Sequence, residues 1–192
     1  MAAPTASISF CPASQRRLHS SWWINREHSG SSPFVDAINW AVEKNITTGK
    51  TANTFAPGEK CTNGQILIFL WRASGSPEPT IDNPFTDSIP ASFQKAAVWA
   101  YEKGLVSGVV FGASTPCTRA VTVTYLWKAA DSPESSENAS CADVPANAEY
   151  AQAVAWAVEN GVTSGTGNGQ FSPDATCTRG QIVTFLHRDM EK

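Results

Sequence analysis

The stretch that decides the fold is NWAVEKNI at residues 39–46, which recurs as VWAYEKGL at 98–105 and as AWAVENGV at 155–162. The tryptophans of these copies are 59 and 57 residues apart, and a glycine follows each tryptophan by nine residues. A Cys-Thr pair then opens a second apolar stretch in every copy, at Cys61-Thr62, Cys117-Thr118 and Cys177-Thr178. Self-similarity at a nearly constant period is the signature of a repeat architecture. The sequence therefore predicts three copies of one structural unit.

Each copy reads as helix, loop, helix. The first helix has apolar residues at helical spacing, such as Ile38 and Ala41, and it ends at a residue tolerant of a left-handed backbone. These end residues are Asn45, Gly104 and Gly161. The second helix opens with an N-cap threonine, and a glutamine three residues later forms a capping box in the first and third copies. The pairs are Thr62 with Gln65 and Thr178 with Gln181, while Thr118 is followed by Val121.

Composition restricts the class of protein. The chain has 192 residues, 42% of them hydrophobic and 16% charged, which is typical of a globular protein. A net charge of −3 argues against a nucleic-acid binder, whose footprint is a basic face. The longest apolar run, residues 66–71, is far below the roughly 20 residues of a membrane span. We expect a monomer that binds neither nucleic acid nor membrane.

The repeat pattern divides the chain into four segments. Residues 1–33 are an N-terminal extension of unclear role, in which no apolar signal-peptide core follows Arg16-Arg17. The three units are expected at 34–78, 85–132 and 141–190, separated by linkers rich in proline, serine and glutamate. Because two short amphipathic helices cannot bury both apolar faces alone, we expect the units to pack into one all-α body.

The combined pattern resembles the S-layer homology module. It consists of Phe-x-Asp, Trp-Ala-x-Glu-x-Gly, Phe-x-Pro and Thr-Arg-Ala/Gly, and it covers about Phe34 to Arg188. The resemblance implies three units packed as a pseudo-threefold prism. It also implies a secreted protein on the bacterial surface, held non-covalently by cell-wall polysaccharide or peptidoglycan-linked glycan. Two departures concern the first unit: its Phe34-Val35-Asp36 is out of register, and Asn63 stands where arginine is expected.

Arg119 and Arg179 are the most informative candidate site residues. Both lie in the first turn of a predicted helix, where a guanidinium beside free N–H groups makes an anion site. Pairing with Asp87, Asp143 or Glu102 across a unit boundary is an equally good reading of the residues. The resemblance favours ligand binding, since the family's arginine at this motif contacts an acidic, often pyruvylated, sugar. It brings Asp87 and Asp143 of the Phe-x-Asp box into the site, and Asn63 as its weaker counterpart.

The remaining aromatic and cysteine residues divide by position. Trp71 and Trp127 near helix ends are candidate platforms for a sugar ring, whereas Trp40, Trp99 and Trp156 are expected in the core. The repeated cysteines lack the close pairs of a zinc site, so we interpret them as buried small hydrophobes. We expect no metal and no cofactor.

Catalytic motifs are sparse. No Gly-x-Ser-x-Gly elbow is present, and of three histidines only His187 lies within a repeat. We therefore favour a non-enzymatic carbohydrate-binding anchor. The alternatives are a small hydrolase acting on glycans or esters, and a protein-interaction module that has lost glycan binding.

Overall fold

The computed structural model describes residues 32–51, 54–135 and 141–191, and over these ranges it is helical with no β-strand. The expected all-α fold is confirmed. Nearly all of the N-terminal extension, residues 1–31, lies outside the described residues. The helices are α2 (Val35–Glu43), α3 (Asn63–Ala73), α4 (Ala91–Glu102), α5 (Arg119–Ala129), α6 (Ala151–Glu159) and α7 (Arg179–Met190).

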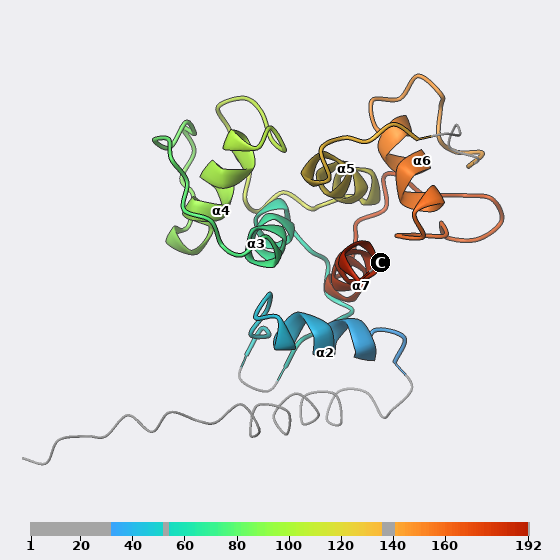
Figure 1. The fold of residues 1–192 in the computed structure, drawn as a ribbon, viewed down its shortest axis with the longest axis horizontal. Helices are drawn as coiled ribbons and strands as arrows, with labels where there is room; N and C mark the ends of the chain where they lie inside the picture. Colours follow the sequence, from blue (N-terminus) through green and yellow to red (C-terminus); the bar gives the residue numbers. More distant parts are fainter. Residues whose placement is uncertain (1–31, 52–53, 136–140, 192) are drawn as a thin grey trace, which may run out of the picture.

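The second helices of the three copies gather at the centre of the molecule. Figure 1 shows α3, α5 and α7 side by side and nearly end-on, with α4, α6 and α2 outside them. Each inner helix contacts the other two. That a regular pseudo-threefold axis relates the units in a prism stays a prediction.

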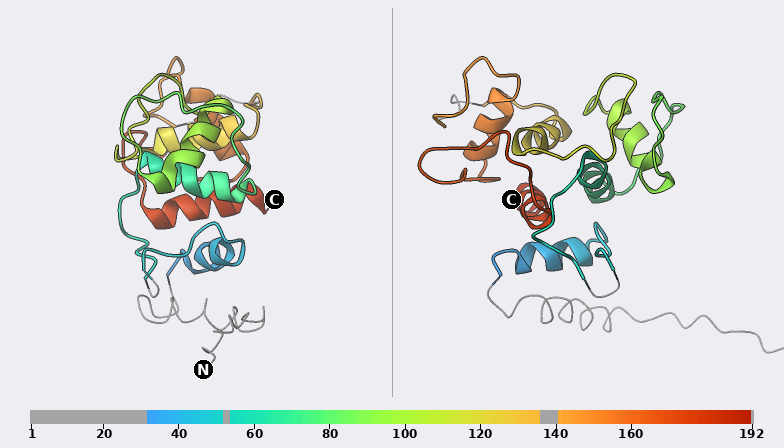
Figure 2. Two further views of the ribbon diagram at one scale, coloured as in Figure 1. Left: turned by 90° about the vertical axis from the view of Figure 1, so that its left-hand side faces the viewer. Right: turned by 180° about the vertical axis from the view of Figure 1, so that it is seen from behind.

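Each outer helix packs against the inner helix of the preceding copy. The closest pairs are α3 with α4, α5 with α6, and α7 with α2. The last pair joins the two ends of the described chain, and both views in Figure 2 place α2 beside α7. The Trp40 indole donates a hydrogen bond of 2.7 Å to Glu191 just beyond α7. Each pair joins two different copies, and the pair of α7 with α2 joins the third copy to the first. The three copies therefore form a closed ring.

The expected helix boundaries are confirmed. The three second helices begin directly after Thr62, Thr118 and Thr178. Thr178 donates its backbone N–H to Gln181 and accepts one from the Gln181 backbone in return. A left-handed residue follows the last residue of each first helix by two positions, with φ values of 58° at Asn45, 69° at Gly104 and 68° at Gly161.

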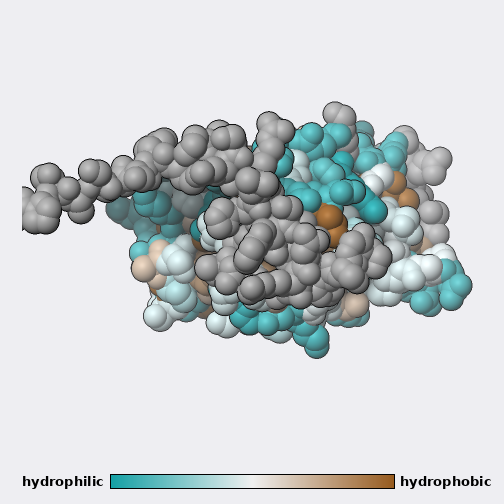
Figure 3. Space-filling view, turned by 90° about the horizontal axis from the view of Figure 1, so that it is seen from below, coloured by the Kyte–Doolittle hydropathy of each residue, from teal (hydrophilic) through white to brown (hydrophobic). Residues whose placement is uncertain are grey.

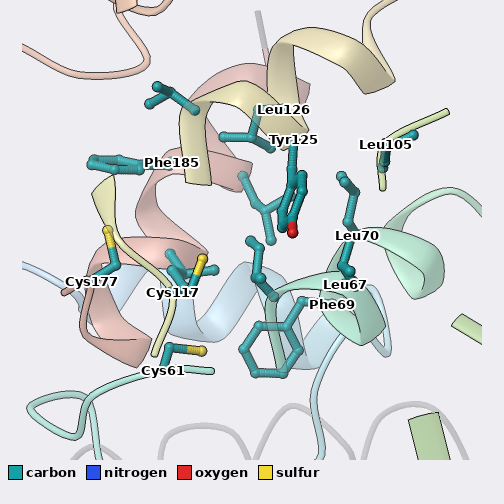
Figure 4. Packing of buried hydrophobic residues seen from close by; sticks show 14 of the residues in the cluster. Cys61, Leu67, Phe69, Leu70, Leu105, Cys117, Tyr125, Leu126, Cys177 and Phe185 are labelled. Carbon is teal, nitrogen blue, oxygen red and sulfur yellow. The ribbon is translucent and has the colours of Figure 1, made fainter. Parts of the chain in front are cut away.

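Three backbone hydrogen bonds link the repeated cysteines in a ring. Cys61 N–H donates to the Cys177 carbonyl at 2.8 Å, Cys117 to Cys61 at 2.9 Å, and Cys177 to Cys117 at 2.9 Å. Their side chains are fully buried near the inner helices, as Figure 4 shows. Burial raises the pKa of Cys61 and Cys117 to about 12, so these thiols stay neutral at physiological pH.

The start of each inner helix is held by the loop of the next copy. The first backbone N–H groups of a helix have no partner inside it. Here Asn63 donates to Thr115 O, Arg119 to Ala175 O, and Arg179 to Glu59 O, each at 2.8–2.9 Å. The following residues repeat the pattern: Gly64 donates to Ala113 O, Ala120 to Pro173 O, and Gly180 to Pro57 O. The loops that carry the Phe-x-Pro motif are thus fixed to the neighbouring helix.

At two of the three helix pairs, an aromatic ring near the start of the outer helix lies over the start of the inner helix. A Cβ built on Gly180 would lie 2.8 Å from ring atoms of Phe34, and one on Gly64 would lie 3.1 Å from Phe93. Phe34 and Tyr150 are the N-cap residues of α2 and α6, six positions before their tryptophans. The glycines therefore provide the room that the packed rings require.

We predict that Gly180→Ala destabilises the protein. Alanine favours a helix over glycine by up to about 1 kcal/mol, but overpacking costs about 1–3 kcal/mol. The matched control is Gly58→Ala, because a Cβ there meets nothing within 4 Å. Urea unfolding should show a lower midpoint for Gly180→Ala alone. Equal midpoints for the two variants would contradict this packing.

Candidate functional site

The two predicted anion-binding arginines are buried between neighbouring copies. Arg119 is 3% exposed and Arg179 is 5% exposed. Arg119 Nε donates to the Phe171 carbonyl at 2.7 Å, and Arg179 Nε donates to the Phe55 carbonyl at 2.9 Å. Each guanidinium thereby holds the loop of the next copy. Direct contact with a glycan stays a prediction, and the burial argues against it.

Both guanidinium groups are also packed against aromatic rings. Arg119 Cζ lies 4.8 Å from the ring centroid of Phe171 and 5.4 Å from that of Phe185. Arg179 Cζ lies 4.7 Å from Phe55 and 5.4 Å from Phe69. Burial lowers the pKa of both arginines from the ordinary value of a guanidinium group. The two sites are cation–π contacts between copies.

Asn63 is the counterpart of these arginines and makes fewer contacts. Its Oδ1 atom is buried and has no hydrogen-bond partner within the described part of the chain. Asn63 also lines a pocket of about 370 Å³. The sequence identified this position as degenerate, and the structure shows what the shorter side chain leaves unfilled.

Asp87 and Asp143 orient the same loops. The two oxygens of Asp87 accept the backbone N–H groups of Phe111 and Gly112 at 2.8 and 2.9 Å. The two oxygens of Asp143 accept hydrogen bonds from the backbone N–H groups of Phe171 and Ser172 at 2.8 and 2.7 Å. These hydrogen bonds, first those from Phe111 and Phe171, lower the pKa of each carboxyl group. Asp143 also interacts electrostatically with Arg119 across the unit boundary.

Trp71 and Trp127 bind the linkers that follow their helices. The Trp71 indole donates to the Pro77 carbonyl and the Trp127 indole to the Pro133 carbonyl, both at 2.8 Å. Both side chains are half-buried. A sugar-stacking role stays a prediction and would use the ring faces that the linkers leave accessible. The three tryptophans expected in the core are buried there.

A pocket of about 370 Å³ is lined mainly by the second copy, with Asn63 from the first copy and Glu149 and Tyr150 from the third. Its buried walls are Leu105, Phe111, Ala120 and Tyr125, and Asn63 contributes to one side. Exposed Ser107, Val110 and Glu149 line its more open part. Lys128 also lines it.

Sequence reasoning assigned no binding role to the bases at the ends of the inner helices. Arg72 donates to the Ile46 carbonyl at 3.2 Å, and Arg188 to that of Val162 at 3.5 Å. Lys128 donates to the carbonyls of Gly104 and Leu105 at 3.2 and 3.3 Å. All three remain at least partly exposed, unlike Arg119 and Arg179. Their recurrence at one repeat position was the signal available in the sequence.

The visible described surface is mostly hydrophilic, with scattered apolar residues (Figure 3). Among the described residues, no cluster of three or more His, Cys, Asp or Glu side chains is arranged to hold a metal ion. None of the helices described has both the length and the apolar character needed to cross a membrane.

Comparison with known proteins supports the resemblance in two of the three copies. The family model of the S-layer homology domain matches residues 29–66 and 142–183. Within the described parts, these segments run from α2 into the start of α3, and from the loop before α6 into the start of α7. The chain is also 30% identical over 101 residues to an endoglucanase of Bacillus sp. (strain KSM-635). That match covers 48% of the chain and 11% of the endoglucanase.

We predict that Arg119→Ala and Arg179→Ala each destabilise the protein by at least about 1.5–3 kcal/mol, the contribution of a hydrogen bond to a charged group. Asn63→Ala should cost less than about 1 kcal/mol, since Asn63 Oδ1 has no partner to lose. Urea unfolding monitored by tryptophan fluorescence measures all three. An Asn63→Ala cost equal to the arginine variants would contradict this assignment.

We further predict that Asp143→Asn reduces the loss of stability in acid. The pKa of folded Asp143 is lowered, so its stabilisation is present above the unfolded pKa of about 3.9 and is lost as pH falls through the folded value. The wild type should therefore lose more stability than the variant below about pH 4, and should be the more stable of the two at pH 7. Unfolding free energies measured across this range test it, and parallel curves would refute it.

Proposed function

We propose that the chain is a non-enzymatic module that anchors a protein to the bacterial cell wall by binding an acidic polysaccharide, pyruvylated forms included. S-layer homology domains generally anchor proteins to the cell wall. The observation that carries the proposal is the match of that family model to most of the first and third copies. The module would act outside the cell as a monomer, and peptidoglycan-linked glycan is its alternative ligand.

The partly exposed bases are the cations best placed for an acidic sugar. Of Arg72, Lys128 and Arg188, we infer that Lys128 is the principal contact, because it lines the pocket of about 370 Å³. An ammonium has three N–H donors. It can therefore hold the carbonyls of Gly104 and Leu105 and still donate to a ligand carboxylate. Tyr150 and Ser107 supply an aromatic ring and a hydroxyl group in the same lining.

The buried polar residues then act as positioning residues. Arg119, Arg179, Asp87 and Asp143 fix the loops through backbone hydrogen bonds. Under this proposal they affect glycan affinity through loop position, and Trp71 and Trp127 contribute a ring edge or face. A binding defect in Arg119→Ala would therefore accompany a stability defect.

We predict that the chain binds purified cell-wall sacculi and loses that binding when the acidic polysaccharide is extracted from them. Lys128→Gln should weaken binding by roughly tenfold, at the low end for a charged hydrogen bond. The matched control is Lys95→Gln, because Lys95 forms a surface ion pair with Glu78. Raising salt from about 0.1 to 1 M shortens the Debye length to about 3 Å and should weaken binding further.

Co-sedimentation with sacculi at several salt concentrations measures these effects. Undiminished binding to extracted sacculi would contradict the polysaccharide as ligand. Equal affinities for Lys128→Gln and Lys95→Gln would remove Lys128 from the site.

A further inference from the structure

Asn63, Arg119 and Arg179 occupy one repeated position, but the side chain of Asn63 is much smaller than the two arginine side chains. Their backbones are held alike, since each donates its N–H to the loop of the next copy at 2.8–2.9 Å. The side chains of Arg119 and Arg179 then extend over that copy's aromatic rings. Asn63 is shorter and uncharged, so it places no cation over the rings of its neighbouring copy.

The surroundings of Arg119 and Arg179 show which groups contact a guanidinium group at this position. Around Arg119 they consist of the Phe171 ring and carbonyl, the Phe185 ring, the hydroxyl of Thr163 and the nearby charge of Asp143. Around Arg179 the counterparts include Phe55, whose carbonyl accepts Nε, and Phe69. Two rings and a carbonyl are thus common to both.

The copy facing Asn63 keeps most of these groups. Phe111 corresponds to Phe171, and Asp87 holds its N–H as Asp143 holds that of Phe171. Tyr125 occupies the position of Phe185, because each lies six residues after the first residue of its helix. Val106 replaces Thr163, which accepts a hydrogen bond from Arg119 Nη2.

The counterparts of the groups around Arg119 line open space. Asn63, Val106, Phe111 and Tyr125 all line the pocket of about 370 Å³. The Asn63 Oδ1 atom is buried beside the pocket and has no hydrogen-bond partner among the described residues. The lining itself includes the aromatic residues Phe111 and Tyr125 and the carboxylate residue Glu149, which together suit a cation that donates hydrogen bonds.

We propose that this pocket binds a guanidinium group supplied from outside the chain, either a small guanidinium compound or the arginine side chain of a partner. Lys128 in the pocket lining is compatible with this, because the filled sites have Arg188 and Arg72 at the same repeat position. The inference does not rest on glycan binding.

Isothermal titration of the wild-type chain with ethylguanidinium tests the proposal, with the neutral isostere ethylurea as control. We expect saturable binding of one ethylguanidinium and none of ethylurea. Intermolecular NOEs should connect the ethyl group to the rings of Phe111 and Tyr125. Titration with N-acetyl-arginine amide then distinguishes the two sources, because it binds only if a peptide-borne arginine fits the opening.

Two variants test the position of the site. Asn63→Arg supplies the group from within, so it should raise the melting temperature and weaken ethylguanidinium binding by at least about tenfold. Arg119→Ala opens an equivalent site, so it should bind a second ethylguanidinium and regain stability on doing so. No saturable binding to the wild type, NOEs elsewhere, or unchanged binding in a folded Asn63→Arg would each overturn the proposal. Co-sedimentation of the wild-type chain with sacculi is a separate measurement, so failure of guanidinium binding is distinguishable from failure of glycan binding.

Discussion

The ring of three hydrogen bonds between Cys61, Cys117 and Cys177 is the constraint on which the rest of the structure depends. Each cysteine precedes an N-cap threonine, so joining the three cysteine backbones brings the starts of the three inner helices together. The unsatisfied N–H groups of each helix then reach the loop of the next copy. Since the pattern runs from first to second to third and back to first, no copy is complete without its neighbours. Fully buried side chains at the cysteine positions follow from the crowding at this centre.

This cyclic arrangement explains why the polar residues that the sequence suggested as ligand contacts stabilise the loops of the fold. A loop that must satisfy a neighbour's helix needs its own backbone fixed, and Asp87 and Asp143 do this with both carboxylate oxygens. The arginines fix it from the other side through carbonyl groups and aromatic rings. Under the proposed function, contact with a ligand is left to the partly exposed bases at the ends of the inner helices, among them Lys128 of α5.

Much of the fold could be predicted from local signals. Capping threonines, left-handed end residues and the apolar period depend on neighbouring residues only, and all three identified the helices correctly. The site was harder, because the sequence places Arg119 at a helix start but cannot show that the Phe171 carbonyl, 52 residues away, meets its Nε. The exchange of partners between copies is likewise invisible in a repeat, since α4 would match the pattern whether it packed on α3 or on α5. The co-occurrence of Asn63 and Val106 in the sequence becomes meaningful only once they line one pocket.

The closure of the ring by α2 and α7 has a mechanical consequence. The other two pairs join helices that follow one another along the chain, whereas this pair joins the first described helix to the last. Tension applied to the two ends therefore reaches the contact between α2 and α7 before any other, including the hydrogen bond from Trp40 to Glu191. Under such a load we expect this contact to be the first to separate. Resistance to pulling is thus a property of where the load is attached as much as of how stable the fold is.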